Sequence, residues 1–158
     1  MAFRPDGALH AFRIADRRHP IFDGAGAYLK GARWTSRGRI AIYAAETYAG
    51  ALLEMLVHTG GSGVPRTHAW IDIRIPSDVP IEEIRAEDLP GWDSEDQSAS
   101  RAFGDLWHDQ RRTAVLLVPS VATNGIERNL ILNPAHPAFP SIRAGKPHDV
   151  KWDTRLFE

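Results

Sequence analysis

The part of the sequence best suited to chemistry runs from a basic loop into an amphipathic segment. Residues 30–39, KGARWTSRGR, gather Lys and Arg side chains around Trp34 and two glycines. Tyr43 lies in the branched segment that follows, and Glu54 lies in the mostly apolar segment after it. Guanidinium groups bind phosphates bidentately, and aromatic faces stack on heterocyclic rings. A carboxylate can stabilise an oxocarbenium ion, as it does in glycosidases.

These residue types suffice to bind a pyrophosphate that carries aromatic rings and to break a bond at its ribose carbon. In this interpretation Arg33 binds phosphate, Tyr43 stacks on nicotinamide, and Glu54 holds the ribose and its developing positive charge. Nicotinamide leaves with a neutral ring nitrogen, so no general acid is required. The alternative that the residues also allow is a solvated loop and a solvent-facing glutamate. Arg37 and Arg39 are interpreted as surface charges.

Hydrophobic periodicity predicts the elements that carry these residues. Residues 39–45, RIAIYAA, are typical of a strand, and residues 46–58 place apolar side chains at i, i+3, i+4 and i+7, as in a helix that GGSG ends. Glu54 falls off the apolar face of that helix. Further strands are expected at 11–15, 69–76, 114–120, 129–134 and 149–157, and a helix at 98–112. Residues 16–38 and 77–97 are expected to be loops.

Short strands and two helices without regular alternation indicate an α+β fold with a mixed or antiparallel sheet, in a single domain over residues 1–158. The net charge of -1 argues against a general nucleic-acid or membrane-surface binder. The absence of cysteine and of an apolar spanning segment favours a cytoplasmic protein. The seven histidines lack metal-ligand spacing, so we expect no metal.

Two polar residues lie at the ends of predicted strands. Ser120 lies in PSVA, which is not the GxSxG pattern of serine hydrolases, and is interpreted as a turn hydroxyl or a ligand contact. Asn133 precedes a proline and is most simply a turn residue. Neither GxGxxG after a strand nor GxxxxGK[ST] occurs, so a Rossmann site and a P-loop are both unsupported.

Four segments together resemble the RES domain, which supplies the toxins of Xre–RES pairs, also called ParS–ParT pairs. The order and spacing match over nearly the whole chain, and the segments are FRIAD (12–16), GARWTSRGRIAIYAAETYAGALLEMLVH (31–58), LLVPSVA (116–122) and NLILNP (129–134). The family loop is usually Gly-Gly-Arg-Trp-Asn, whereas this chain has Ala32 and Thr35, and Ile14 stands where some relatives have tyrosine. These departures are compatible with NAD binding, but they leave undetermined which acceptor receives the ADP-ribosyl group.

The resemblance implies an ADP-ribosyltransferase-like fold, a split mixed sheet around an NAD crevice. It implies NAD as a substrate, with no prosthetic group. Glu54, Arg33 and Tyr43 match the family's catalytic positions, and the residues that match its NAD-binding positions are Arg13, Arg33, Tyr43, Ser120 and Asn133. It also implies a cognate antitoxin with an Xre-like DNA-binding domain that covers the active site.

Three functions are compatible with the sequence. The first is a toxin that cleaves NAD at the nicotinamide–ribose bond and passes ADP-ribose to phosphate, water or a protein. The second is a dedicated mono-ADP-ribosyltransferase of one cellular protein, with little turnover of free NAD. The third, of another class, is a non-catalytic interaction module whose basic loop meets an acidic partner.

Overall fold

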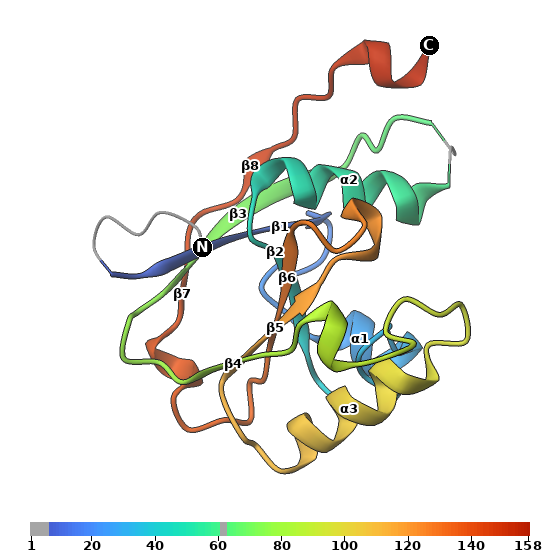
Figure 1. Ribbon diagram of the computed structural model, residues 1–158. Helices are drawn as coiled ribbons and strands as arrows, with labels where there is room; N and C mark the ends of the chain where they lie inside the picture. Colours follow the sequence, from blue (N-terminus) through green and yellow to red (C-terminus); the bar gives the residue numbers. More distant parts are fainter. Residues whose placement is uncertain (1–6, 61–62) are drawn as a thin grey trace.

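The strands of the computed structural model, which describes residues 7–60 and 63–158, form an eight-stranded sheet (Figure 1). They are β1 (Leu9–Asp16), β2 (Ile42–Ala45), β3 (His68–Ile75), β4 (Ile81–Glu83), β5 (Val115–Pro119), β6 (Arg128–Leu132), β7 (Arg143–Ala144) and β8 (His148–Asp149). Their order is β4-β5-β6-β2-β1-β3-β7, and β8 also pairs with β3. Strands β4 and β5 run parallel and the other pairs antiparallel, so the predicted mixed sheet is confirmed.

The α-helices lie in two places around this sheet. Helix α2 (Tyr48–Thr59) follows β2 almost directly, and the Thr47 hydroxyl caps it by accepting a 2.8 Å hydrogen bond from the amide of Gly50. It ends at Gly60, whose φ of 57° suits a residue without a side chain. Helices α1 (Ala25–Lys30) and α3 (Ser98–Asp109) lie together, away from α2 (Figure 1). The 3₁₀ turns are η1 (Ala86–Asp88), η2 (Val121–Thr123), η3 (Phe139–Ser141) and η4 (Thr154–Phe157).

The two faces of the sheet bury different sets of side chains. As the alternation predicts, Ile71, Ile73 and Ile75 all point into one apolar cluster, which also holds alternate residues of β1, β2, β5 and β6. The other face carries two smaller clusters, one beneath α2 around Ala45 and one beside α3 around Trp107. Helices α2 and α3 are therefore packed over different parts of the same face.

Strand β1 separates from β2 after one pairing, Phe12 with Ala45, although it pairs with β3 along its whole length. The side chain of Arg13 takes the place of further ladder hydrogen bonds. Its Nη1 donates to the carbonyl of Tyr43 at 2.8 Å, and its Nε donates to the carbonyl of Ile21 at 2.7 Å. The sheet is thus split next to the predicted site, and the guanidinium satisfies carbonyls that would otherwise lack a donor.

The remaining differences from the prediction lie in the connections and at the C-terminal end. The expected loop at 16–38 contains α1, and the expected loop at 77–97 contains β4 and η1. The predicted strand at 149–157 is wrong, because β8 ends at Asp149 and η4 follows. There the indole of Trp152 donates to the carbonyl of Pro65 at 3.0 Å, which holds the segment against a loop instead of a strand. The other predicted strands and both helices are confirmed, with shifted ends.

Candidate active site

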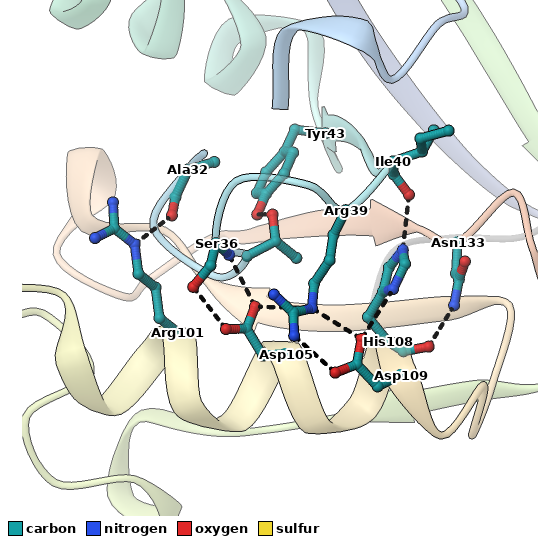
Figure 2. Close-up of polar contacts among 11 residues, drawn as sticks. Ala32, Ser36, Arg39, Ile40, Tyr43, Arg101, Asp105, His108, Asp109 and Asn133 are labelled. Carbon is teal, nitrogen blue, oxygen red and sulfur yellow. Dashed lines mark hydrogen bonds and ion pairs between the residues drawn. The ribbon is translucent and has the colours of Figure 1, made fainter. Parts of the chain in front are cut away.

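The basic loop at residues 30–39 lies on α3, and contacts with that helix fix its shape (Figure 2). Trp34 is buried, and its carbonyl oxygen approaches Gly104 of α3 so closely that a Cβ on that glycine would collide with it. Ser36 donates from its amide and its hydroxyl to the carboxylate of Asp105, at 2.8 Å and 2.6 Å. The loop is therefore a docked element and not a free solvated segment.

The loop's arginines have different surroundings. Arg39 donates to both carboxylate oxygens of Asp109 on α3, at 2.8 Å and 2.7 Å. This hydrogen bonding lowers the pKa of Asp109. Arg37 is exposed. The interpretation of both as surface charges omits the structural role of Arg39, which ties the end of the loop to α3.

Arg33 points from the same loop to the segment that leads into α3. Its Nη1 donates to the carbonyls of Ser94, at 2.8 Å, and Trp92, at 3.3 Å. The ring of Trp92 in turn lies against Gly125, since a Cβ there would stand 3.3 Å from the indole. Among the described residues, Nε and Nη2 of Arg33 have no hydrogen-bond partner, so they are free to bind an anion.

The side chain of Tyr43, on β2, contacts this loop. Its hydroxyl lies 2.7 Å from Oγ1 of Thr35, which is fully buried. Burial raises the pKa of Tyr43, and the hydrogen bond between its hydroxyl and that of Thr35 only partly opposes that shift. The phenol is therefore neutral at physiological pH, and its ring is packed against the cluster beside α3.

Glu54, on the part of α2 that the sequence left as either solvent-facing or functional, meets side chains from two distant segments. The hydroxyl of Ser120 and the amide of Asn129 each donate to Oε1 of Glu54, both at 2.9 Å. Within the described part of the chain, Oε2 has no hydrogen-bond partner. One oxygen of the carboxylate is thus held in place and the other is available to a ligand.

The positions of both donors follow from the sheet. Ser120 directly follows β5 and is only 2% exposed, and its amide donates to the carbonyl of Glu127 at 3.0 Å. The amide of Gly125 donates to the carbonyl of Ser120 at 2.7 Å, which closes the turn around η2. Asn129 lies on β6 opposite Ala45, at the end of β2 that leads into α2. The strand ends and the helix therefore meet at one place.

An ion-pair network beside these contacts holds the start of α2 to β6. Arg128 donates to the carboxylates of Glu46, at 3.0 Å, and Glu83, at 3.1 Å. The hydroxyl of Thr47 donates to Glu127 at 2.5 Å. Glu46 and Thr47 directly precede α2, and Glu127 and Arg128 stand at the start of β6, so these contacts help to fix how α2 lies on the sheet.

Asn133 lies elsewhere. It is fully buried at the far end of β6, where its Nδ2 donates to the carbonyl of His108 at 3.1 Å and its Oδ1 accepts from the amide of Ala135 at 3.0 Å. Four residues of strand, about 13 Å at the usual rise, separate it from Asn129. The structure therefore brings Asn129, and not Asn133, to Glu54. The polar start of an otherwise apolar strand was the signal for Asn129 in the sequence.

The candidate residues other than Asn133 are linked by a continuous path of contacts. Arg13 binds the backbone of Tyr43, whose hydroxyl binds Thr35 in the Arg33 loop. Arg33 of that loop contacts the backbone of Trp92, and the ring of Trp92 lies against Gly125 in the turn after β5. Ser120, at the start of the same turn, donates to Glu54. Within the described part of the chain, Arg13 and Arg33 each keep N–H groups without a hydrogen-bond partner, and they stand on a path that also includes a neutral phenol and a held carboxylate. Among residues 7–60 and 63–158, no group of three or more His, Asp or Glu side chains is placed to hold a metal ion.

Comparison with known proteins identifies the family. The model of the RES domain matches residues 10–153, most of the chain. The chain belongs to the RES family. This RES chain is 40% identical over 137 residues to the Prs ADP-ribosylating toxin of Sphingobium sp. (strain YBL2), with 84% of each chain covered. It is 33% identical over 150 residues to Toxin Res of Yersinia enterocolitica, with 92% of this chain and 97% of that protein covered.

A solved structure has the same fold. The M. tuberculosis MbcT–MbcA toxin–antitoxin complex contains a chain that superposes with a TM-score of 0.74 and 15% identity, covering 95% of this RES chain and 87% of that one. The resemblance to the RES toxin family and the expected α+β fold are thereby confirmed. No described helix of this RES chain has the length and apolar character needed to cross a bilayer.

Proposed function

We propose that this RES chain cleaves NAD at the nicotinamide–ribose bond and passes the ADP-ribosyl group to phosphate, water or a protein side chain. The observation that carries the proposal is the carboxylate of Glu54. Two donors, Ser120 and Asn129, hold its Oε1 at 2.9 Å, while Oε2 has no partner among the described residues. A held carboxylate with one free oxygen suits a ribose hydroxyl and the positive charge that develops beside it.

The chemistry needs few groups. When the C1′–N bond breaks, its electron pair goes to the nicotinamide ring, which leaves neutral, and the ribose becomes an oxocarbenium ion. Glu54 stabilises that cation, and an acceptor oxygen then attacks C1′ and loses its proton to solvent. The free N–H groups of Arg33 and of Arg13 bind the diphosphate, and the neutral ring of Tyr43 flanks the nicotinamide. No step requires a metal or a prosthetic group.

The test is nicotinamide release from NAD by the purified chain, with and without phosphate. We expect Glu54→Gln to lower the rate by about 10²–10³-fold, because it removes the charge that stabilises the cation. Glu87→Gln, an exposed carboxylate on η1, is the matched control and should not change the rate. A strong phosphate requirement identifies a phosphorylase, and indifference to phosphate identifies hydrolysis or transfer. Undiminished release by Glu54→Gln contradicts the proposed role.

The second candidate is transfer to a specific protein with little turnover of free NAD. It is favoured by the 40% identity to a protein named as an ADP-ribosylating toxin. Incubation with labelled NAD and cell lysate distinguishes the two. Glu54-dependent labelling of one protein band without release in buffer supports transfer. Folded protein that gives neither labelling nor release contradicts both enzyme functions and leaves the interaction module.

The same proposal extends to a toxin–antitoxin pair that acts in the cytoplasm, where NAD is available. MbcT, which shares the fold, was solved in a complex with the antitoxin MbcA. We infer that a cognate antitoxin with an Xre-like DNA-binding domain covers the candidate site near Arg13 and Arg33. Expression of the chain alone should arrest growth, and Glu54→Gln should restore it. Normal growth with folded wild-type protein contradicts a toxin.

A further inference from the structure

A cavity opens beside the basic loop, between the end of α1 and the first turns of α3. Its volume is about 430 Å³, and it is lined by Lys30, Gly31, Ser36, Arg37 and Arg101. None of the residues assigned above to the candidate active site lines it. Pockets of this size hold small ligands. The cavity combines cations from two helices and a loop in a chain whose net charge is -1.

The cations around this cavity are not neutralised within the described residues. The exposed side chains of Lys30 and Arg37 form neither a hydrogen bond nor an ion pair there. The Nε of Arg101 donates to the carbonyl of Ala32 at 3.1 Å, which fixes the guanidinium, and neither Nη group has a hydrogen-bond partner among the residues that the structure describes.

The carboxylate of Asp105, one turn along α3 from Arg101, does not offset these cations. It accepts two hydrogen bonds from Ser36 and lies 3.5 Å from Nε of Arg39. The guanidinium of Arg101 is turned away from it (Figure 2). The positive charge of the cavity is therefore available to a ligand.

The backbone adds to the same site. Gly31 has a φ of 71°, and a Cβ there would stand 3.3 Å from the amide nitrogen of Arg37. That amide makes no hydrogen bond within the described part of the chain. Because Gly31 has no side chain, there is room for a ligand atom beside the amide of Arg37.

We propose that the cavity lined by Lys30, Arg37 and Arg101 binds a phosphoryl group of a small molecule. Ammonium and guanidinium groups together with a backbone N–H match the several oxygens of a phosphoryl group, which spreads its charge over all of them. A nucleic acid would need a broad positive field, which a chain of net charge -1 lacks. The phosphoryl group belongs either to a dinucleotide, whose diphosphate would then lie here instead of on Arg13 and Arg33, or to a separate phosphorylated molecule. The inference does not depend on NAD cleavage.

The test is titration calorimetry with inorganic pyrophosphate. The test variant is Lys30→Ala/Arg37→Ala, which removes two exposed cations and leaves the docking of the loop intact. We expect it to bind pyrophosphate about 100-fold more weakly than wild type, on the estimate of about tenfold for each charge-assisted contact. The matched control is Arg143→Ala/Lys146→Ala, an exposed pair near β7, which should bind as wild type does. Binding by wild type should also weaken as salt is added.

A second titration distinguishes the sources of the phosphoryl group. If prior saturation with ADP-ribose abolishes pyrophosphate binding at the Lys30 and Arg37 cavity, the site serves the dinucleotide. If pyrophosphate still binds with the same affinity, the site serves a separate phosphorylated molecule. The proposal is overturned if wild type does not bind pyrophosphate, or if the Lys30→Ala/Arg37→Ala and control variants bind it equally.

Discussion

The amide of Asn129 donates a 2.9 Å hydrogen bond to Oε1 of Glu54, although 75 residues of chain separate the two. The contact exists because β2 pairs with β6 on one side and leads into α2 on the other. It identifies Asn129 as a positioning residue for the carboxylate, whereas the resemblance had pointed to Asn133, as a match to an NAD-binding position, and not to Asn129.

Asn129→Asp should shift the pH dependence of NAD cleavage. A second carboxylate at hydrogen-bond distance disfavours ionisation of the pair, so the acid limb of the rate profile should move up by about one pH unit or more. Asn129→Ala, which removes the donor without adding charge, is the control and should shift the limb less. An unchanged limb in Asn129→Asp would show that Glu54 does not act as an ionised carboxylate.

Gly104→Ala should strongly destabilise the fold, because the new Cβ would collide with the carbonyl of Trp34. We expect a loss of about 3 kcal/mol in the free energy of unfolding, measured by urea denaturation. Gly26→Ala on α1 is the control, since a Cβ there meets nothing within 4 Å. It should stabilise by about 0.5–1 kcal/mol, and equal effects of the two substitutions would contradict the docking of the loop.

Tyr43→Phe should change how stability depends on alkaline pH. Burial raises the pKa of Tyr43 in the folded state, so the unfolded phenol, with its ordinary pKa of about 10, loses its proton first. The free energy of unfolding should therefore fall as the pH rises above about 10. Tyr43→Phe should reduce that fall, whereas Tyr28→Phe at an exposed site should not. Identical slopes in both variants would mean that Tyr43 titrates as a free phenol.

Arg13→Lys should lower stability even though it keeps the charge. One ammonium cannot reproduce the two hydrogen bonds that Nε and Nη1 make to the carbonyls of Ile21 and Tyr43. Leaving one buried carbonyl without a donor should cost about 1–3 kcal/mol, measured by chemical denaturation. Arg17→Lys, at an exposed position directly after β1, is the control and should change stability little. Full stability of Arg13→Lys would mean that the split between β1 and β2 does not depend on the guanidinium.

Local patterns in the sequence determined the elements around the site. The spacing of the leucines predicted α2, because apolar residues three and four positions apart lie on one face of a helix. Gly60 predicted the end of α2, because glycine readily adopts the left-handed conformation found there. The alternation of Ile71, Ile73 and Ile75 predicted the buried face of β3 for the same reason. The short elements α1 and β4 were not predicted, because a few residues are too short a segment to show a hydrophobic periodicity.

Tertiary structure alone decided what faces Glu54 and what holds the basic loop. The helical pattern left the Glu54 side of α2 either exposed or functional, and only the pairing of β2, β5 and β6 brings Ser120 and Asn129 to it. Likewise, only the docking of the loop on α3 shows that the two arginines differ. Arg39 is paired with Asp109, whereas Arg37 lines the cavity beside the loop. Periodicity reports which side of an element is buried, whereas cross-strand neighbours depend on pairings between segments far apart in the chain.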